Sequence, residues 1–99
     1  MVGFEWDLVK EAENLHKHGT DFTTASWIWR GPVLERIDDR RDYGEVRILA
    51  FGKVDGRLIA VLFTWRGANR RIISARKANR REQRLFEEEI GEHNGPPTN

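Results

Sequence analysis

The run Leu58-Ile59-Ala60-Val61-Leu62-Phe63 is the longest apolar stretch of the chain. Both faces of a strand with this sequence are apolar, which predicts a central strand that is covered on both sides. The pair Asp55-Gly56 before it supplies the positive φ of a tight hairpin turn, so a strand over residues 46–52 is expected beside it. Residues 67–69 then turn the chain again, and residues 70–76 are predicted to return as a third antiparallel strand.

The N-terminal third is predicted to hold a short strand and two helices. Residues 3–6 alternate as a strand does. Asp7 can cap a helix that ends at Gly19, where a left-handed conformation is easily adopted. The apolar stripe of this helix is formed by Leu8, Ala12 and Leu15. Asp21 can cap a second, shorter helix over residues 22–29, whose apolar residues recur at helical spacing.

One more strand and one more helix complete the predicted order. Residues 33–37 read as a short edge strand, and Asn79 with Glu82 has the capping-box spacing of a helix start, with Gly91 as its stop. The chain is thus predicted to be an α+β protein: an antiparallel sheet of three to five strands packs on two N-terminal helices, and a C-terminal helix follows. Because that last helix has a thin apolar stripe, part of the second sheet face is left for a partner chain or a ligand.

Length and composition indicate one polar, globular domain. The chain has 99 residues, 33% of them charged, and no cysteine, which excludes disulfides and cysteine-based metal sites. Residues 1–90 are assigned to this domain, and residues 91–99, which lack periodicity, to a flexible C-terminal tail. No signal peptide and no membrane-spanning run is visible, so a cytoplasmic location without membrane association is expected.

Positive charge is concentrated in one part of the chain. Residues 66–84 contain eight Lys or Arg and a single acidic residue, a formal charge of +7 in a chain whose net charge is +1. The rest of the molecule therefore carries about −6 by count. A local field of this kind directs a polyanion such as a nucleic acid to one surface.

A series of short motifs extends from residue 4 to about residue 88. It consists of Phe4-Glu5-Trp6-Asp7, Lys10, Asn14, Lys17-His18-Gly19, Asp39-Arg40, Asp42-Tyr43-Gly44-Glu45, Arg47, Gly52, Arg66-Gly67, Arg71-Ile72-Ile73-Ser74-Ala75-Arg76-Lys77-Ala78 and Glu82. Together and in this order, these motifs resemble the BrnT family of toxins from bacterial type II toxin–antitoxin pairs.

The resemblance implies a RelE-like ribonuclease fold. It implies a toxin that cleaves RNA, stops translation and is held inactive by a tightly bound BrnA-type antitoxin. It further implies a complex of two toxins with two antitoxins, in which the antitoxin supplies the binding to DNA.

The chain departs from the family's pattern at four positions. Trp65 stands where the family often has Glu, and Ala68 where it often has an acidic residue. Arg41 stands where His is common, and Asp21 where Ser is common. Trp65 is instead a candidate for stacking an RNA base.

Three arginines, Arg66, Arg71 and Arg76, are the candidates for the chemistry of RNA cleavage. Cleavage without a metal needs an aligned 2′-hydroxyl, a stabilised phosphate and a protonated leaving oxygen. An arginine suits the phosphate because its planar fork holds two oxygens and stays charged. Lys77 is expected to add a supporting charge. The three histidines lack metal-ligand spacing, so neither a metal nor another cofactor is expected.

Strand alternation restricts how these arginines can meet. In a regular strand, Arg71 and Lys77 lie on one face, whereas Arg70, Ser74 and Arg76 lie on the other. Arg71 and Arg76 then share a site only if the strand twists or ends near residue 74, or if one works from the sheet edge. A site at the turn is favoured, with Arg71 on the open face beside Arg66, and a packing-and-pairing role for Arg76 is an equal alternative.

Other side chains are candidates for proton transfer and RNA contacts. His18 could act as a general acid or base, or it could cap the carbonyl end of its helix. Residues 42–45 read first as a turn that leads into a strand, with Glu45 as a second candidate base in this polar loop. Arg80 and Arg81, with Lys77 and Trp65, are the expected RNA-binding residues.

Three functions from different classes therefore stay open. The first is a metal-independent endoribonuclease toxin. The second is a non-catalytic nucleic-acid-binding protein that uses its basic residues for phosphate contacts alone. The third is a partner-binding module whose open sheet face receives a segment of another chain.

Overall fold

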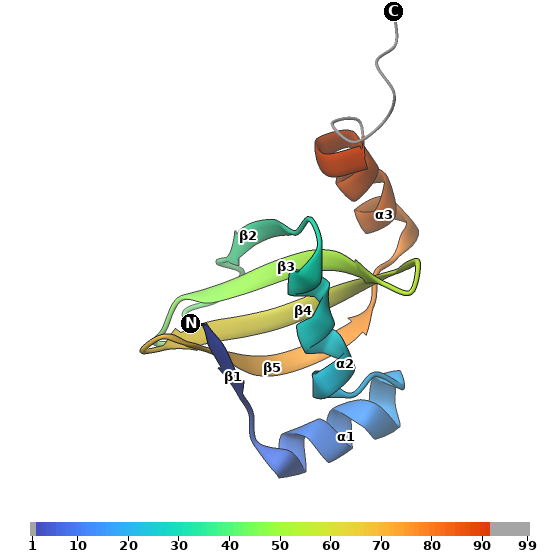
Figure 1. Ribbon diagram of the computed structural model, residues 1–99. Coiled ribbons are helices and arrows are strands. Elements are labelled where there is room, and N and C mark those ends of the chain that lie inside the picture. The colour runs from blue at the N-terminus through green and yellow to red at the C-terminus, as the bar shows by residue number, and fades with distance from the viewer. Residues whose placement is uncertain (1, 92–99) are drawn as a thin grey trace, which may run out of the picture.

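The structure is a computed structural model that describes residues 2–91. A five-stranded sheet of order β1-β5-β4-β3-β2 lies between helical segments (Figure 1). The elements are β1 (Gly3–Glu5), α1 (Leu8–His18), α2 (Phe22–Ser26), the 3-10 helix η1 (Trp27–Arg30), β2 (Leu34–Asp38), β3 (Arg47–Val54), β4 (Arg57–Arg66), β5 (Asn69–Lys77), α3 (Arg80–Phe86) and the π-helical turn η2 (Glu87–Gly91). The α+β prediction is confirmed, whereas most of the expected tail lies outside the described residues.

β4 is the central strand, as its sequence predicts. It pairs antiparallel with both β3 and β5, and residues 58–63 are all buried. Ile59, Val61 and Phe63 join the core under α2 and η1, on what we call the α2 face of the sheet. Leu58 and Ala60 point to the opposite side, the α3 face, where they pack with residues of α3. The strand is therefore covered on both sides over this length.

The sheet is mixed rather than purely antiparallel. β1 pairs parallel with the first residues of β5, with Gly3 opposite Asn69 and Glu5 opposite Arg71. The sequence of a three-residue strand does not indicate whether it pairs parallel or antiparallel. The prediction of a purely antiparallel sheet was therefore wrong for β1. This pairing covers only the beginning of the β5 edge.

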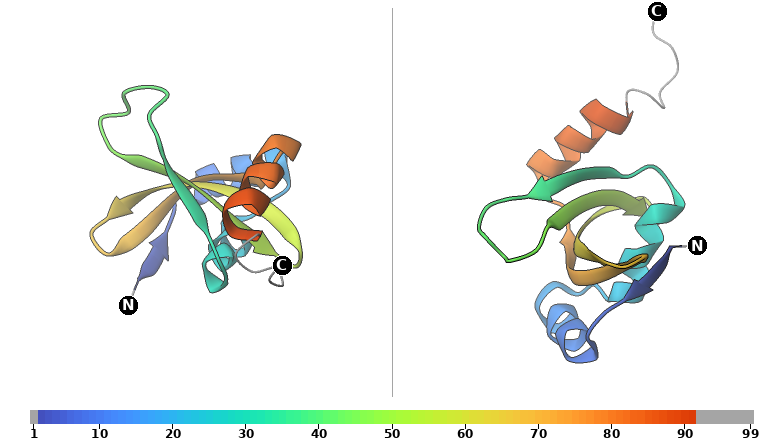
Figure 2. Two further views of the ribbon diagram at one scale, coloured as in Figure 1. Left: turned by 90° about the horizontal axis from the view of Figure 1, so that it is seen from above. Right: turned by 90° about the vertical axis from the view of Figure 1, so that its left-hand side faces the viewer.

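α1 covers the rest of that edge instead of packing on a sheet face (Figures 1 and 2). Its cap at Asp7 and its stop at Gly19 are as predicted. Its apolar stripe faces solvent, with 74% of Leu8 and 47% of Leu15 exposed, so the expectation that both N-terminal helices pack on one face was wrong. Among the helices of the described residues, α2 and η1 cover the α2 face.

A buried amide holds α1 in place. The side chain of Asn14 donates to the carbonyl oxygens of Ala75 (2.8 Å) and Thr20 (2.9 Å), and it accepts from the backbone N–H of Ala75 (3.1 Å). Asn14 thus bonds to both backbone groups of a β5 residue, as a neighbouring strand would. Because buried backbone groups must find partners, this one side chain closes the β5 edge.

Close contact between η1 and β3 requires a glycine at position 52. A Cβ built on Gly52 would lie 2.7 Å from the Cβ of Ile28 and 3.1 Å from its carbonyl oxygen. Ile28 is fully buried in the core of the α2 face. The glycine that ends the predicted strand therefore lets η1 approach the sheet.

We expect Asn14→Ala to lower the free energy of unfolding by about 2–4 kcal/mol, because it leaves the N–H and C=O of Ala75 buried without partners. Urea unfolding followed by circular dichroism measures this change. Glu13→Ala, at the exposed neighbouring position of the same helix, is the control and should change stability little. Equal stability of the two variants would show that the Asn14 contacts do not hold the helix.

Candidate functional site

An irregularity in β5 decides which basic side chains share a face. Leu62 of β4 lies opposite Ser74, but the next residue, Phe63, lies opposite Ile72. Ile73 is therefore an extra residue, a β-bulge, and it shifts the alternation of side chains by one position. As a result, Ile72 and Ala75 are both buried in the core of the α2 face, although they are three residues apart.

The bulge corrects the faces expected from regular alternation. Arg71 lies opposite Thr64 and Arg76 opposite Ala60, so both arginines are on the α3 face. Lys77, opposite Ile59, is on the α2 face, where regular alternation would have put it with Arg71. Arg71 and Arg76 share a face because of the bulge, which is neither the twist nor the strand end near residue 74 that the sequence led us to expect.

Arg66, Arg71 and Arg76 thus point to one side, which we call the arginine face. Arg71 of β5 lies opposite Thr64 of β4, and Arg66 is two residues farther along β4. The two arginines are therefore diagonal neighbours about 7–8 Å apart. Arg76 lies opposite Ala60, which is four residues before Thr64 on β4, so Arg76 is roughly 13 Å from Arg71 along the sheet. The expected pairing of Arg66 with Arg71 is therefore compatible with one phosphate, whereas Arg76 is farther along the strand and its fork is bonded to Glu82.

Each of these arginines forms an ion pair with a glutamate. Arg71 Nη1 is 2.8 Å from Glu5, and Arg66 Nη2 is 3.8 Å from Glu45. Arg76 donates through both terminal nitrogens to Glu82, at 2.7 and 2.9 Å. The fork of Arg76 is thereby used to join β5 to α3, and this bond raises the pKa of Arg76. Arg71, in contrast, keeps two nitrogens free of bonds to Glu5.

Glu5 joins the candidate site, although the sequence did not indicate a role for it. The parallel pairing of β1 with β5 brings it to the arginine face. Hydrogen bonds from Asn69 (3.2 Å) and Arg71 (2.8 Å) lower the pKa of Glu5, so it stays ionised at neutral pH. The alternation of residues 3–6 was the available signal, because it puts Glu5 on the side opposite the two aromatic residues.

A hydrogen-bonded network orders the loop between β2 and β3 at the rim of this face. Asp38 is buried, and hydrogen bonds from Arg40 lower its pKa to about 2. The hydroxyl of Tyr43 also donates to Asp38, at 3.1 Å. The ring of Tyr43 lies 4.1 Å from the guanidinium of Arg47, which donates to Glu45 at 3.1 Å. The network therefore positions Glu45 between Arg47 and Arg66.

Trp65 does not belong to the arginine face. It lies opposite Arg70 on the α2 face, with its ring centre 4.8 Å from that guanidinium. Three further rings, those of Trp29, Phe63 and Phe4, surround Arg70 at 4.4–6.0 Å. Burial among these rings lowers the pKa of Arg70. Trp65 thus closes an aromatic box around a cation, at a distance where cation–π attraction is effective.

The other predicted site residues are spread around the molecule. His18 is exposed at the end of α1, and the following Gly19 lines a hollow with Lys77, at the end of β5 opposite Arg71. Arg80 and Arg81 are exposed on the first turn of α3. Arg81 lines a concavity of about 780 Å³ beside Arg76, whereas Arg80 lines a separate groove. The structure does not bring His18 to the arginine face.

A family model described as the ribonuclease toxin BrnT of type II toxin–antitoxin systems matches residues 6–82. This is most of the chain, and it includes the strand and turn that form the arginine face. The chain belongs to the BrnT family. Membership in a type II toxin–antitoxin family implies an antitoxin partner. No curated protein matches the chain.

A crystal structure of the Brucella abortus ribonuclease toxin BrnT is similar in fold. The two structures align with a TM-score of 0.60 and 26% sequence identity, over 81% of this chain and 100% of the Brucella chain. Within the described residues, no helix has the length and apolarity needed to cross a membrane.

The departure from the BrnT pattern at Trp65 acquires a structural explanation. A glutamate at this position would face Arg70 across the β4–β5 pair and could neutralise it. Here the aromatic box holds the arginine instead. Because position 65 is on the α2 face, the substitution leaves the carboxylates of the arginine face in place.

Asp38 makes the stability of this BrnT-family protein sensitive to acid. Its pKa falls from 3.8 to about 2 on folding, so its ionised form stabilises the fold above pH 4, and this contribution is lost as the pH falls towards 2. We expect wild type to exceed Asp38→Asn in free energy of unfolding at pH 5 and the difference to shrink at pH 2. Urea unfolding across this range measures it, with Asp39→Asn, an exposed neighbour, as the control. A constant difference would contradict the prediction.

Proposed function

We propose that this BrnT-family protein is a metal-independent endoribonuclease that cleaves RNA in the cytoplasm and thereby inhibits translation. The observation that supports this most directly is the placement of Arg66 and Arg71 as diagonal neighbours on one sheet face. Carboxylates accompany both arginines. Permanent cations next to a carboxylate offer phosphate binding and proton transfer without a metal.

The proposed reaction is an attack of a ribose 2′-oxygen on the adjacent phosphorus. Glu45 accepts the proton of the 2′-hydroxyl, while Arg66 and Arg71 bind the phosphate oxygens as negative charge develops on them. The bond from phosphorus to the 5′-oxygen breaks, and that oxygen takes up a proton from solvent. The products are a 2′,3′-cyclic phosphate and a 5′-hydroxyl.

Two further residues have positioning roles in this proposal. Glu5 orients Arg71 by binding one of its terminal nitrogens, so the free nitrogens can address the substrate. Arg76 acts through Glu82, because the bidentate pair fixes the start of α3 against β5. Its fork therefore contributes to the shape of the site rather than to a phosphate contact.

The remaining predicted residues extend the binding surface. Arg81 supplies positive charge beside the arginine face, on the flank of α3, and Lys77 supplies it on the α2 face at the end of β5. Trp65 lies on the α2 face, and its role in stacking an RNA base stays a prediction. An acid–base role for His18 also stays a prediction, which the variant His18→Ala tests. Loss of cleavage with intact RNA binding would support proton transfer by His18.

We further propose that a BrnA-type antitoxin neutralises the toxin in a complex of two toxins and two antitoxins. DNA binding would then belong to the antitoxin. The family match supports an antitoxin partner, and the exposed apolar stripe of α1 offers unburied surface of the kind that protein partners cover. Molar mass by light scattering of the co-purified complex tests the stoichiometry.

Purified protein should cleave RNA in the presence of EDTA. We expect Arg71→Ala to slow cleavage by about 10²–10³-fold and Arg66→Ala by a similar factor, because each removes a group that stabilises the phosphate. Arg30→Ala, which removes an exposed arginine far from this face, is the matched control. Gel analysis of a labelled RNA measures the rates, and circular dichroism checks that the variants fold.

Three outcomes would contradict this proposal. Cleavage that survives Arg66→Ala and Arg71→Ala together would exclude the proposed phosphate site. Inhibition by EDTA would exclude metal independence. RNA binding without any cleavage by wild type would favour the non-catalytic nucleic-acid-binding protein.

A further inference from the structure

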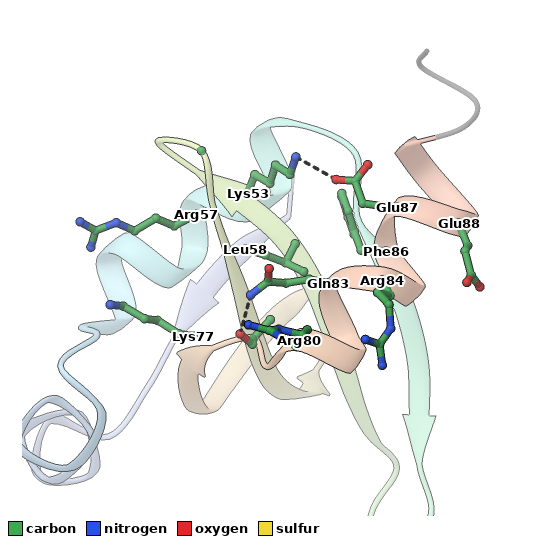
Figure 3. A pocket seen from close by; sticks show the side chains of 12 residues that line it. Lys53, Arg57, Leu58, Lys77, Arg80, Gln83, Arg84, Phe86, Glu87 and Glu88 are labelled. Atoms are coloured by element: carbon green, nitrogen blue, oxygen red, sulfur yellow. Dashed lines mark hydrogen bonds and ion pairs between the residues drawn. The ribbon is translucent and has the colours of Figure 1, made fainter. Parts of the chain in front are cut away.

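A groove separates the tip of the β3–β4 hairpin from α3. It has a volume of about 730 Å³, and five basic side chains line it against two acidic ones (Figure 3). The basic residues are Lys53, Arg57, Lys77, Arg80 and Arg84, and the acidic ones are Glu87 and Glu88. The basic residues come from four elements, β3, β4, β5 and α3, and the acidic ones from η2. The groove therefore gathers cations that are far apart in the sequence.

Most of these cations lack an anionic partner within residues 2–91. Lys53 forms an ion pair with Glu87 at 3.3 Å, whereas Arg57, Lys77 and Arg80 form none. Figure 3 shows Arg57 and Lys77 extending to the same side from neighbouring strands, with Arg80 approaching from α3. On the arginine face, in contrast, each arginine is paired. Converging unpaired cations repel one another, so an anion bound between them would relieve this repulsion.

The floor of the groove is apolar. Leu58, Ala78 and Phe86 lie between the charged rims and are themselves 4–8% exposed. Positive rims over an apolar floor suit single-stranded nucleic acid, whose phosphates and flat base faces need both. Asp55 and Asp21 line the adjoining hollow beyond Arg57, which limits the favourable potential to the groove itself.

The groove adjoins the arginine face at α3, although Arg57 and Lys77 reach it from the α2 face of the sheet. Arg84 lines both the groove and the concavity that contains Arg76, so α3 is a ridge between two basic hollows. Measured along β4 alone, Arg57 is seven residues, or roughly 23 Å, from Thr64, the partner of Arg71. Because the two arginines are on opposite faces of the sheet, this is the shortest separation that an RNA strand must span. With about 3.4 Å between the charges of a stacked strand, roughly seven nucleotides would span this distance.

We propose that this groove binds backbone phosphates of the RNA substrate, at least about seven nucleotides from the bond that the arginine face cleaves. The inference rests on the proposed ribonuclease function and adds a second anchoring site to it. Arg57 and Arg80 bind phosphates directly, and Lys53 is held by Glu87 at the rim. The site gives the enzyme affinity for long single strands without reading their sequence.

The test is binding of a fluorescein-labelled, twelve-nucleotide 2′-O-methyl RNA, which lacks the attacking hydroxyl. Anisotropy titrations at several salt concentrations give the slope of log K against log salt. Arg57→Gln and Arg80→Gln should each reduce that slope by about 0.7 and the double variant by about 1.4, because one phosphate contact is lost per arginine. Arg30→Gln removes an equal charge outside the groove and should leave the slope unchanged.

The outcomes separate the groove from the catalytic proposal. If wild type binds the probe but cleaves no ordinary RNA, while the groove variants bind the probe more weakly, RNA binding by the groove is supported and the ribonuclease function is contradicted. If wild type cleaves RNA and the groove variants keep its salt slope, the groove proposal fails. Unchanged RNA binding combined with weaker antitoxin binding would assign the groove to an acidic segment of the partner and overturn the proposal.

Discussion

One extra residue in β5, Ile73, determines which basic side chains of residues 66–84, which we call the basic stretch, lie on the same face of the sheet. Two apolar residues, Ile72 and Ala75, must both enter the core of the α2 face, yet they are three positions apart. A regular strand would turn one of them to the opposite side. The bulge at Ile73 resolves this conflict, and burial of the core thereby places the arginines on a common face. The arginine face, our candidate functional surface, is in this sense a consequence of packing on the other side of the sheet.

The basic stretch divides into two electrostatic classes. The arginines on the strand have glutamate partners that are partly exposed, and such pairs contribute at most about 1 kcal/mol each to stability. Their main effect is to hold the guanidinium groups in fixed directions. The side chains at the end of β5 and on α3 are mostly unpaired and supply a field instead. A chain of nearly zero net charge can thus attract a polyanion to one side.

Local signals in the sequence predicted most of the secondary structure. The caps at Asp7 and Asn79 and the Asp-Gly turn are all present, because each depends on a few neighbouring residues. The bulge could not be predicted, since the sequence around Ile73 is compatible with either alternation. The direction of β1 depends on a distant strand, and so does the arrival of Glu5 at the site. The resemblance to a family indicated candidate residues but not which face each occupies.

The amide of Asn14 closes the edge of β5 in place of a strand, and this has a consequence for motion. A ladder of backbone bonds opens only when a whole strand leaves, whereas this closure depends on a helix that buries little apolar surface. The hydrogen of the Ala75 amide should therefore exchange with solvent water through local release of α1, without unfolding of the sheet. The most protected amides should then belong to β4. The two edges of β5 differ in mobility, because the edge closed by Asn14 opens more readily than the edge paired with β4.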